Sequence, residues 1–268
     1  MPQLLNQFGW RQTFDYFAYG FIILSLIIFC FLRNKPKSDI EVVSKEAIAD
    51  NKAASWTALK CVLKSKATWM NALFCGLVFA PMALYGESWG AAFLTGVHDI
   101  PVTQSGPAVS AIFVGWCLGA PISGALSNVI GRKPVMRIAA IGGLIFIPII
   151  MFVHPLPLMG ICAVNFLFGL TNSGLVASYT IAGEMHSRQT AGLSMAIANM
   201  FTIIIGLGLQ PFVGTILDMR FSEHAQYLDG IPVYLASDYQ AALIMMPVSL
   251  LLALLCTFGI PETLKKTG

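Results

Sequence analysis

Apolar residues are gathered in long runs that are separated by short polar stretches. Each run is at least about as long as the 20 residues that a helix needs to cross the hydrocarbon core of a bilayer. The pattern therefore predicts an all-α integral membrane protein. Its seven transmembrane helices are expected at residues 14–32, 68–96, 103–127, 135–153, 157–183, 191–217 and 240–260.

Charged residues are few, and their distribution predicts an orientation. They make up 11% of the chain, whereas soluble domains usually carry about 25%, so the soluble enzyme classes are excluded. Fourteen of the sixteen Lys and Arg residues fall on one side of the seven-span topology, and only Arg11 and Arg220 fall on the other. By the positive-inside rule, we expect an external amino end and a cytoplasmic carboxyl end. The expected location is the cell (inner) membrane.

One polar stretch divides the chain unequally. Residues 33–66 contain eight bases and four acids, which is typical of a cytoplasmic linker. The predicted organisation is an external start with one span at residues 1–32, a linker at residues 33–66, and a six-span bundle at residues 67–268.

Motifs of enzyme, metal and cofactor chemistry are missing from the sequence. The six cysteines include no C-x-x-C pair, and the four histidines have no metal-ligand spacing. There is no phosphate-binding loop and no nucleophile elbow. We therefore expect a protein that is not an enzyme and that holds no metal and no cofactor.

Glu87 is the acid that stands out, because it lies inside the second apolar run, which proline and glycine residues punctuate. Acids within spans are costly and usually face a cavity or a partner. Broken helices in transporters tend to line binding sites. Glu87 is thus a candidate for binding a substrate amine or carrying a proton, with Tyr85 and Trp89 lining the cavity. The alternative is simple solvation, because Glu87 lies roughly 28 Å along the helix from Thr68 and hence in the outer third of the membrane.

Two amides in the fifth run are further candidates for substrate contact. Asn165 and Asn172 are seven residues apart and therefore share one helix face. The alternative is that they only form hydrogen bonds across helices, as Asn commonly does within a membrane bundle.

Local sequences resemble the second half of a known transporter family. Residues 124–134 are similar to the cytoplasmic G-x-L-x-D-x-x-G-R-K loop of the major facilitator superfamily. Further similarities follow in the family's order and cover nearly the whole chain: Gly9-Trp10-Arg11, then Glu184 with Arg188 and Gly192, then residues 210–214 with Asp218, and finally Pro261-Glu262-Thr263. The resemblance implies the sixth to the twelfth span, with the last six forming a 3+3 inverted repeat. A looser similarity points to a bacterial branch related to lysosomal dipeptide, amino-acid and organic-acid carriers.

The resemblance also implies a cytoplasmic gate loop, formed by Gly124, Asn128, Gly131, Arg132 and Lys133. In the family an aspartate occupies the position of Asn128 and links to neighbouring helices. The substitution implies that the bases here lack their anionic partner, which leaves a charge-relay role open. The alternative is a tight turn whose basic residues only follow the preference of Lys and Arg for the cytoplasmic side.

The function implied is secondary active transport of a small polar solute by alternating access, with proton symport. The solute would be an amino acid, a dipeptide or an organic acid. The expected partners are the lipid bilayer, this substrate, protons, and either a missing amino-terminal six-span half or a second copy; nucleic acid is not among them. The alternatives are a fragment or truncated half without activity alone, a seven-helix receptor, and a drug efflux pump.

Overall fold

The computed structural model describes residues 2–31, 59–187, 190–222, 227–228, 231–232 and 234–264. Most of the predicted linker and Arg188 lie outside the described residues. The chain divides into two compact units, Met1–Ser55 and Trp56–Gly268, and each is considered by itself.

The first unit contains one long helix, α1 (Pro2–Phe31). Gly9 interrupts it with non-helical backbone angles (φ 73°, ψ 167°), and the hydroxyl of Thr13 donates a hydrogen bond of 2.8 Å to the Gly9 carbonyl. From Gly9 to Phe31 the helix is long and apolar enough to cross a membrane. Its large apolar side chains are exposed, which suits a lipid environment.

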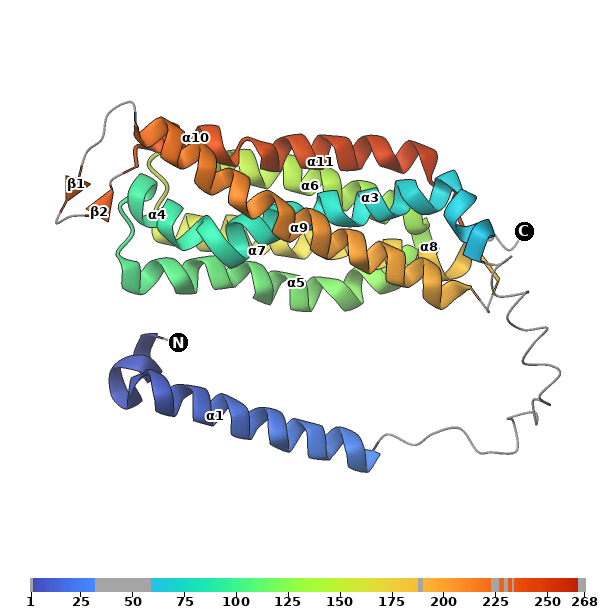
Figure 1. Ribbon diagram of the computed structural model, residues 1–268, viewed down its shortest axis with the longest axis horizontal. Coiled ribbons are helices and arrows are strands. Elements are labelled where there is room, and N and C mark those ends of the chain that lie inside the picture. The colour runs from blue at the N-terminus through green and yellow to red at the C-terminus, as the bar shows by residue number, and fades with distance from the viewer. Residues whose placement is uncertain are drawn as a thin grey trace. The chain divides into compact units, whose positions relative to one another are not determined.

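The second unit is a bundle of membrane-length helices (Figure 1). The segments follow the predicted runs, with ends that differ by at most four residues. They are α3 (Lys66–Pro81), the π-helix η2 (Met82–Trp89) and α4 (Gly90–His98); α5 (Val102–Ile130); α6 (Arg132–Phe152); α7 (Leu158–Asn172), the 3₁₀-helix η3 (Ser173–Leu175) and α8 (Val176–Glu184); α9 (Ala191–Phe221); and α10 (Ala236–Leu243), α11 (Met245–Cys256) and the 3₁₀-helix η4 (Thr257–Gly259). With α1, the described part of the chain has seven candidate membrane spans, so the predicted fold class is confirmed.

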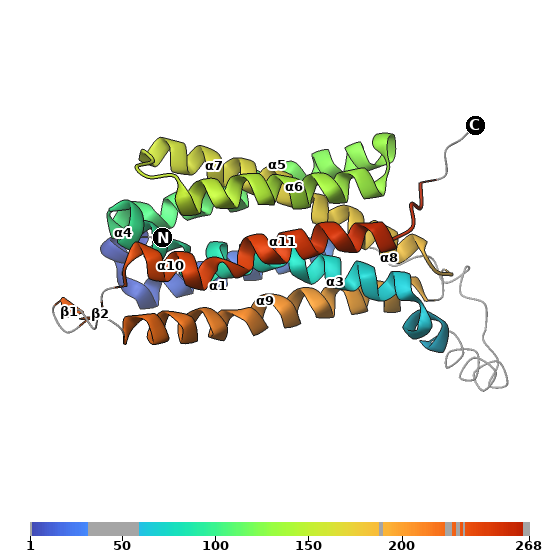
Figure 2. The ribbon, with the colours of Figure 1, turned by 90° about the horizontal axis from the view of Figure 1, so that it is seen from above.

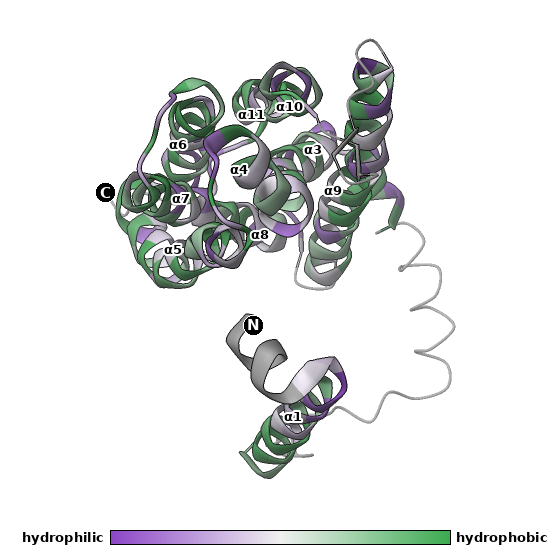
Figure 3. Cartoon of the chain, turned by 90° about the vertical axis from the view of Figure 1, so that its left-hand side faces the viewer, coloured by the Kyte–Doolittle hydropathy of each residue, from purple (hydrophilic) through white to green (hydrophobic). Residues whose placement is uncertain are grey.

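The bundle is arranged in two layers. Figure 2 shows α5, α6 and α7 on one side and α3, α9 and α11 on the other, and contacts between α6 and α11 join the layers. Seen along the bundle, most residues of its helices are hydrophobic (Figure 3). A short antiparallel hairpin, β1 (Tyr227–Leu228) with β2 (Ile231–Pro232), adds a small departure from the all-helical expectation.

Two large clusters of buried apolar side chains, beside a small third one around Val62, form the core. One contains Tyr85, Phe93 and Ile112, and the other contains Phe74 and Met136. We name the two ends of the bundle after residues at the ends of its helices. The Arg132 end carries the turn between α5 and α6, and the His98 end carries the turn between α4 and α5.

Candidate functional site

Two helices of the bundle contain a π-helical or 3₁₀ segment within their length, and a third span, Ala236–Gly259, is divided at Ile244 between α10 and α11. The span Lys66–His98 contains the π-helix η2, and the span Leu158–Glu184 contains the 3₁₀-helix η3. They are the first and the fourth of the six bundle helices, which are corresponding positions in a repeat of three plus three. Interrupted helices at corresponding positions of two repeats are a pointer to a transporter binding site.

Polar side chains tie these two helices together. The amide nitrogen of Asn172 donates to the Val78 carbonyl oxygen at 2.9 Å, and that of Asn71 donates to the Ser178 carbonyl oxygen at 3.1 Å. The Cys75 thiol and the Ser178 hydroxyl are hydrogen-bonded at 2.9 Å. We call the side chains of Asn71, Cys75, Asn172 and Ser178, together with those of Tyr85 and Asn165, the polar seam.

The part of the seam toward the His98 end contains two of the predicted site residues. Asn165 is fully buried, and its amide nitrogen donates to the Ala108 carbonyl oxygen of α5 at 2.8 Å. The buried hydroxyl of Tyr85 lies beside the Asn165 side chain, although no hydrogen bond of normal geometry joins them. Both residues therefore face the helix interface, whichever further role they have.

The seam leaves several of its polar atoms unpaired. The tyrosine hydroxyl and the amide oxygens of its three asparagines find no hydrogen-bond partner in the part of the chain that the structure describes. A buried polar atom without a partner costs about 1–3 kcal/mol. The seam is therefore an uncharged contact. The stability that its hydrogen bonds contribute is offset by the cost of its unpaired polar atoms.

Glu87 lies on the exposed part of the π-helix η2. Its side chain and that of Ser88 are exposed, and the half-buried Trp89 packs beside Gly214 of α9. No ion pair joins Glu87 to a basic group among the described residues. Single π-helical turns are frequent at functional sites, so Glu87 is an accessible carboxylate on an irregular turn. The predicted set is thus divided: Tyr85, Asn165 and Asn172 belong to the seam, whereas Glu87 and Trp89 lie on the more exposed part of η2.

At the Arg132 end, one guanidinium group joins three helix ends. Arg132 forms an ion pair of 3.0 Å with Glu184 at the end of α8. It also donates to the hydroxyl of Ser127 at 2.9 Å and to the amide oxygen of Asn128 at 2.6 Å, both in α5. The Arg132 side chain is 9% exposed, against 38% for Glu184. Planar guanidinium groups suit such multiple contacts.

A second acid completes this cluster. Glu262 accepts hydrogen bonds of 3.0 Å from the backbone nitrogens of Arg132 and Lys133, so it caps the start of α6. Partial burial alone would raise the pKa of Glu262, but backbone N–H donors from Leu264, Lys133, Arg132 and Thr263 outweigh it and hold the pKa below its ordinary value. We call Ser127, Asn128, Arg132, Glu184, Glu262 and Thr263 the charged cluster.

Glycine at the α5–α6 turn is required by the cluster. Gly131 has φ +106°, and a Cβ atom there would lie 2.8 Å from a carboxylate oxygen of Glu262. Gly124, by contrast, has open space around it, and its carbonyl oxygen accepts a hydrogen bond from Ser127.

The expectation that the basic loop lacks an anionic partner is wrong. Asn128 does replace the family's acid and accepts a hydrogen bond, but Glu184 and Glu262 supply the negative charge from distant parts of the chain. Sequence reasoning also missed the roles of Cys75 and Ser178, because a single small polar residue within an apolar run has no distinctive pattern. No group of three or more His, Cys, Asp or Glu side chains that could hold a metal occurs within the described residues.

Comparison with known proteins decides the family. Residues 88–268 match the model of the Major Facilitator Superfamily. The chain belongs to the Major Facilitator Superfamily. This confirms the identification made from the loop at residues 124–134, and it agrees with the two-layered bundle of interrupted helices.

One solved structure has a fold similar to that of this chain. It is a bacterial homologue of the human lysosomal transporter Spinster, in an inward-facing and unoccupied conformation, with a TM-score of 0.62 and 19% sequence identity. The match covers 94% of this chain and 60% of the Spinster homologue. At this identity the similarity concerns the fold alone. No curated protein matches the sequence.

Proposed function

We propose that this superfamily chain supplies the second six-helix bundle, with the preceding span, of a proton-coupled secondary transporter. Its substrate would be a small polar solute such as an amino acid, a dipeptide or an organic acid. The single observation that carries the proposal is Glu87, an exposed carboxylate on a π-helical turn within an otherwise apolar membrane-length helix. An acid within a membrane-spanning helix is costly unless it faces a cavity or takes part in function.

The polar seam supports alternating access, in which bundle helices move relative to one another. It joins the two interrupted helices through neutral hydrogen bonds and leaves buried polar atoms unpaired. Interhelical hydrogen bonds in membranes contribute on average only about 0.6 kcal/mol each. A contact of this kind can rearrange without separating buried charges.

The charged cluster supports a gate at the cytoplasmic side. It links the ends of α5 and α8, the start of α6 and the segment after η4 through one ion pair and several hydrogen bonds. Under the proposed orientation this cluster faces the cytoplasm, where Gly124, Asn128, Gly131, Arg132 and Lys133 would act as the gate loop of the bundle.

The test is solute transport by the purified chain in liposomes. We would measure accumulation of radiolabelled amino acids, dipeptides and organic acids driven by an inward proton gradient, and solute exchange without a gradient. If Glu87 carries the proton, Glu87→Gln abolishes gradient-driven accumulation and keeps exchange, because exchange needs no net proton transfer. Asp99→Asn is the matched control. Asp99 is an exposed acid just after the same helix, with a left-handed backbone (φ 55°) that asparagine also adopts.

Two results would each count against one part of the proposal, the first against Glu87 as proton carrier and the second against activity of the chain by itself. Gradient-driven accumulation that survives Glu87→Gln would remove Glu87 as the proton carrier. Absence of both accumulation and exchange in the unmodified chain would favour the alternative of a half-transporter that is inactive alone. That alternative predicts recovery of activity only with an added amino-terminal bundle or a second copy.

A further inference from the structure

Two basic side chains near the start of α6 have no acidic partner. Lys133 and Arg137 are four residues apart, so they share one face of the helix. No ion pair joins either of them to an acid among the described residues. The acids at this end are engaged elsewhere: Glu184 pairs with Arg132, and Glu262 accepts hydrogen bonds from backbone nitrogens. The pair therefore carries two positive charges that the protein itself does not balance by contact.

The guanidinium group of Arg137 is held in one direction by the segment η4. Its Nε donates to the Thr257 hydroxyl at 3.2 Å, and its Cζ lies 5.0 Å from the centroid of the Phe258 ring. The Phe258 side chain is 69% exposed. The two terminal NH₂ groups of Arg137 form no hydrogen bond within the part of the chain that the structure describes. They can therefore donate side by side to two oxygens of one phosphate group.

Both bases lie at the depth of lipid headgroups. The span Arg132–Phe152 is long enough to cross a membrane, and Arg137 lies roughly 7.5 Å along the helix from Arg132 at about 1.5 Å per residue. The headgroup region on each side of a bilayer is about 5–7.5 Å thick. A basic side chain deeper in the span would be costly without a partner. At this depth the natural partner is a group that the lipid supplies.

An apolar surface continues from the two bases along the bundle. On α6, Ile141 and Ile145 are exposed and extend the four-residue spacing of the bases. On α11, which packs against α6, the exposed Leu251 and Leu255 precede Phe258 at spacings of four and three residues. The two rows meet where Arg137 contacts the Phe258 ring. Positive charge at one end and exposed apolar side chains beyond it complement an anionic head joined to acyl chains.

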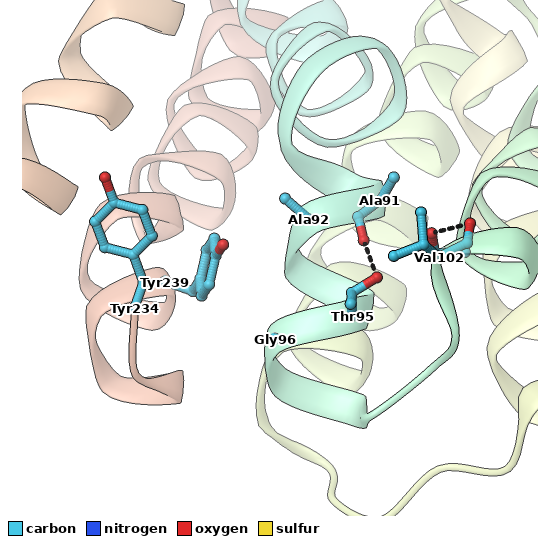
Figure 4. Close-up of a pocket in the computed structure, with 8 residues that line it drawn as sticks. Ala91, Ala92, Thr95, Gly96, Val102, Tyr234 and Tyr239 are labelled. Carbon is cyan, nitrogen blue, oxygen red and sulfur yellow. Dashed lines mark hydrogen bonds between the residues drawn. The ribbon is translucent and has the colours of Figure 1, made fainter. Parts of the chain in front are cut away.

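The opposite end of the bundle has a pocket of different character. It has a volume of about 470 Å³, and it lies between α4 with the start of α5 on one side and Tyr234 and Tyr239 on the other (Figure 4). None of the eight residues that line it is charged. It therefore lacks a basic side chain for an anionic headgroup, and it provides a control for lipid that binds through its acyl chains alone.

We propose that Lys133, Arg137 and Phe258 form a binding site for the headgroup of an anionic phospholipid. The Arg137 guanidinium would donate to two phosphate oxygens, the Lys133 ammonium would add a second positive charge, and the Phe258 ring would keep the guanidinium in place. The acyl chains would lie along the exposed apolar rows of α6 and α11. The site belongs to the second unit alone, and it does not depend on the transport function proposed above.

The test is native mass spectrometry of the full chain in detergent micelles. We would titrate phosphatidylglycerol and phosphatidylcholine with the same acyl chains. Each base near a membrane surface contributes about 1 kcal/mol, which is about fivefold in affinity. We therefore expect phosphatidylglycerol to bind about tenfold more tightly or better, because the choline group cancels the phosphate charge. Equal affinity for the two lipids would overturn the proposal.

A soluble headgroup distinguishes a lipid site from a site for free phosphate compounds. Glycerol 3-phosphate would be titrated into the same micelles. We expect it to bind far more weakly than phosphatidylglycerol, because it lacks the acyl chains that contact α6 and α11. Binding of glycerol 3-phosphate as tight as that of phosphatidylglycerol would assign the two bases to a soluble ligand and overturn the lipid site.

Variants locate the site. Arg137→Gln and Lys133→Gln should each lower the affinity for phosphatidylglycerol about fivefold and leave that for phosphatidylcholine nearly unchanged. Arg11→Gln is the matched control for net charge. Arg11 also lies over an aromatic ring, with its Cζ 5.1 Å from the centroid of Trp10, and α1 contains no other base. Equal losses in all three variants would mean attraction by net charge and would overturn the proposal.

Two further measurements keep the result clear. Thermal unfolding without added lipid checks that each variant is folded, and Lys133→Gln removes a side chain that forms no hydrogen bond among the described residues. Ala92→Leu fills the pocket at the His98 end and should leave the preference for phosphatidylglycerol unchanged. Loss of that preference in Ala92→Leu, with retention in Arg137→Gln, would place the lipid in the pocket and refute the site on α6.

Discussion

The charged cluster and the polar seam both place polar groups between apolar helices, but they satisfy those groups to different degrees. In the cluster, the Arg132 guanidinium donates to three side chains, and the carboxylates of Glu184 and Glu262 accept several hydrogen bonds. In the seam, four buried polar atoms remain unpaired among the described residues. The comparison indicates a bundle that is fastened at one end and only loosely joined along its interrupted helices.

The largest effect is expected when the centre of the charged cluster is removed. Arg132→Leu leaves Glu184, Asn128 and Ser127 without their donor. Breaking a buried ion pair costs about 3–5 kcal/mol. We expect Arg132→Leu to lower the free energy of unfolding by about 2 kcal/mol. The loss is smaller than for a fully buried pair because Glu184 is 38% exposed, so water replaces part of the interaction.

Unfolding in detergent micelles, followed by tryptophan fluorescence, checks this expectation. Lys133→Gln is the control, because the contact of Lys133 with the cluster runs through its backbone nitrogen. The Lys133 variant should change stability by less than about 0.5 kcal/mol, as surface substitutions usually do. Similar losses in both variants would show that the cluster acts only through net charge.

A comparable loss is expected when the turn cannot adopt its backbone conformation. Gly131→Ala forces a side chain into a conformation with φ +106° and into contact with Glu262, at a cost of about 1–3 kcal/mol. Gly124→Ala lies in open space within α5, so it should be neutral or stabilising by up to about 1 kcal/mol. Thermal unfolding of the two variants side by side measures the difference. A neutral Gly131→Ala would mean that the turn is free to change shape.

A small effect is expected in the seam. Asn172→Leu removes the hydrogen bond to Val78, worth about 0.6 kcal/mol in a membrane protein, and it also removes an unpaired amide oxygen of the same side chain. The two changes oppose each other, so stability should change by less than about 1 kcal/mol. The same unfolding assay applies. A loss as large as that of Arg132→Leu would break the comparison between the two regions.

The smallest effect is expected in the pH dependence of stability. The pKa of Glu262 is lower in the folded protein than its ordinary value of 4.5. Its contribution is therefore present above the ordinary value and is lost as the pH falls through the folded pKa. Unfolding temperatures measured from pH 7 down to pH 3 should fall less in Glu262→Gln than in the unmodified chain. Parallel curves would show that the cap does not titrate in this range.

Much of the fold could be predicted from the sequence, while the pairing of its helices could not. The seven spans follow from run length, because a helix in lipid must satisfy its own backbone. Pro81, Gly86 and Gly90 indicated an irregular helix, and the structure has a π-helix at that place. The ends of the spans were less predictable, since helices continue past the apolar run wherever they can pack or be capped.

The candidate site was only partly accessible from the sequence. Glu87 stands out from its position alone, because an acid within an apolar run is rare. The partners of Asn172 and Arg132 lie 94 and 52 residues away, respectively. Which polar groups meet depends on the crossing of helices, and no periodic pattern records it.

The sequence by itself determined the membrane environment, the number of spans, the side preferred by the bases and the family. These properties follow from apolar length, charge and short local motifs, all of which act within one segment of chain. Only the tertiary structure decided that Glu184 and Glu262 compensate for Asn128, that Tyr85 and Asn165 face a buried seam, and that two tyrosines form a pocket wall. These features arise where side chains from separate helices come within hydrogen-bonding or van der Waals distance, and that proximity is a property of the packed bundle.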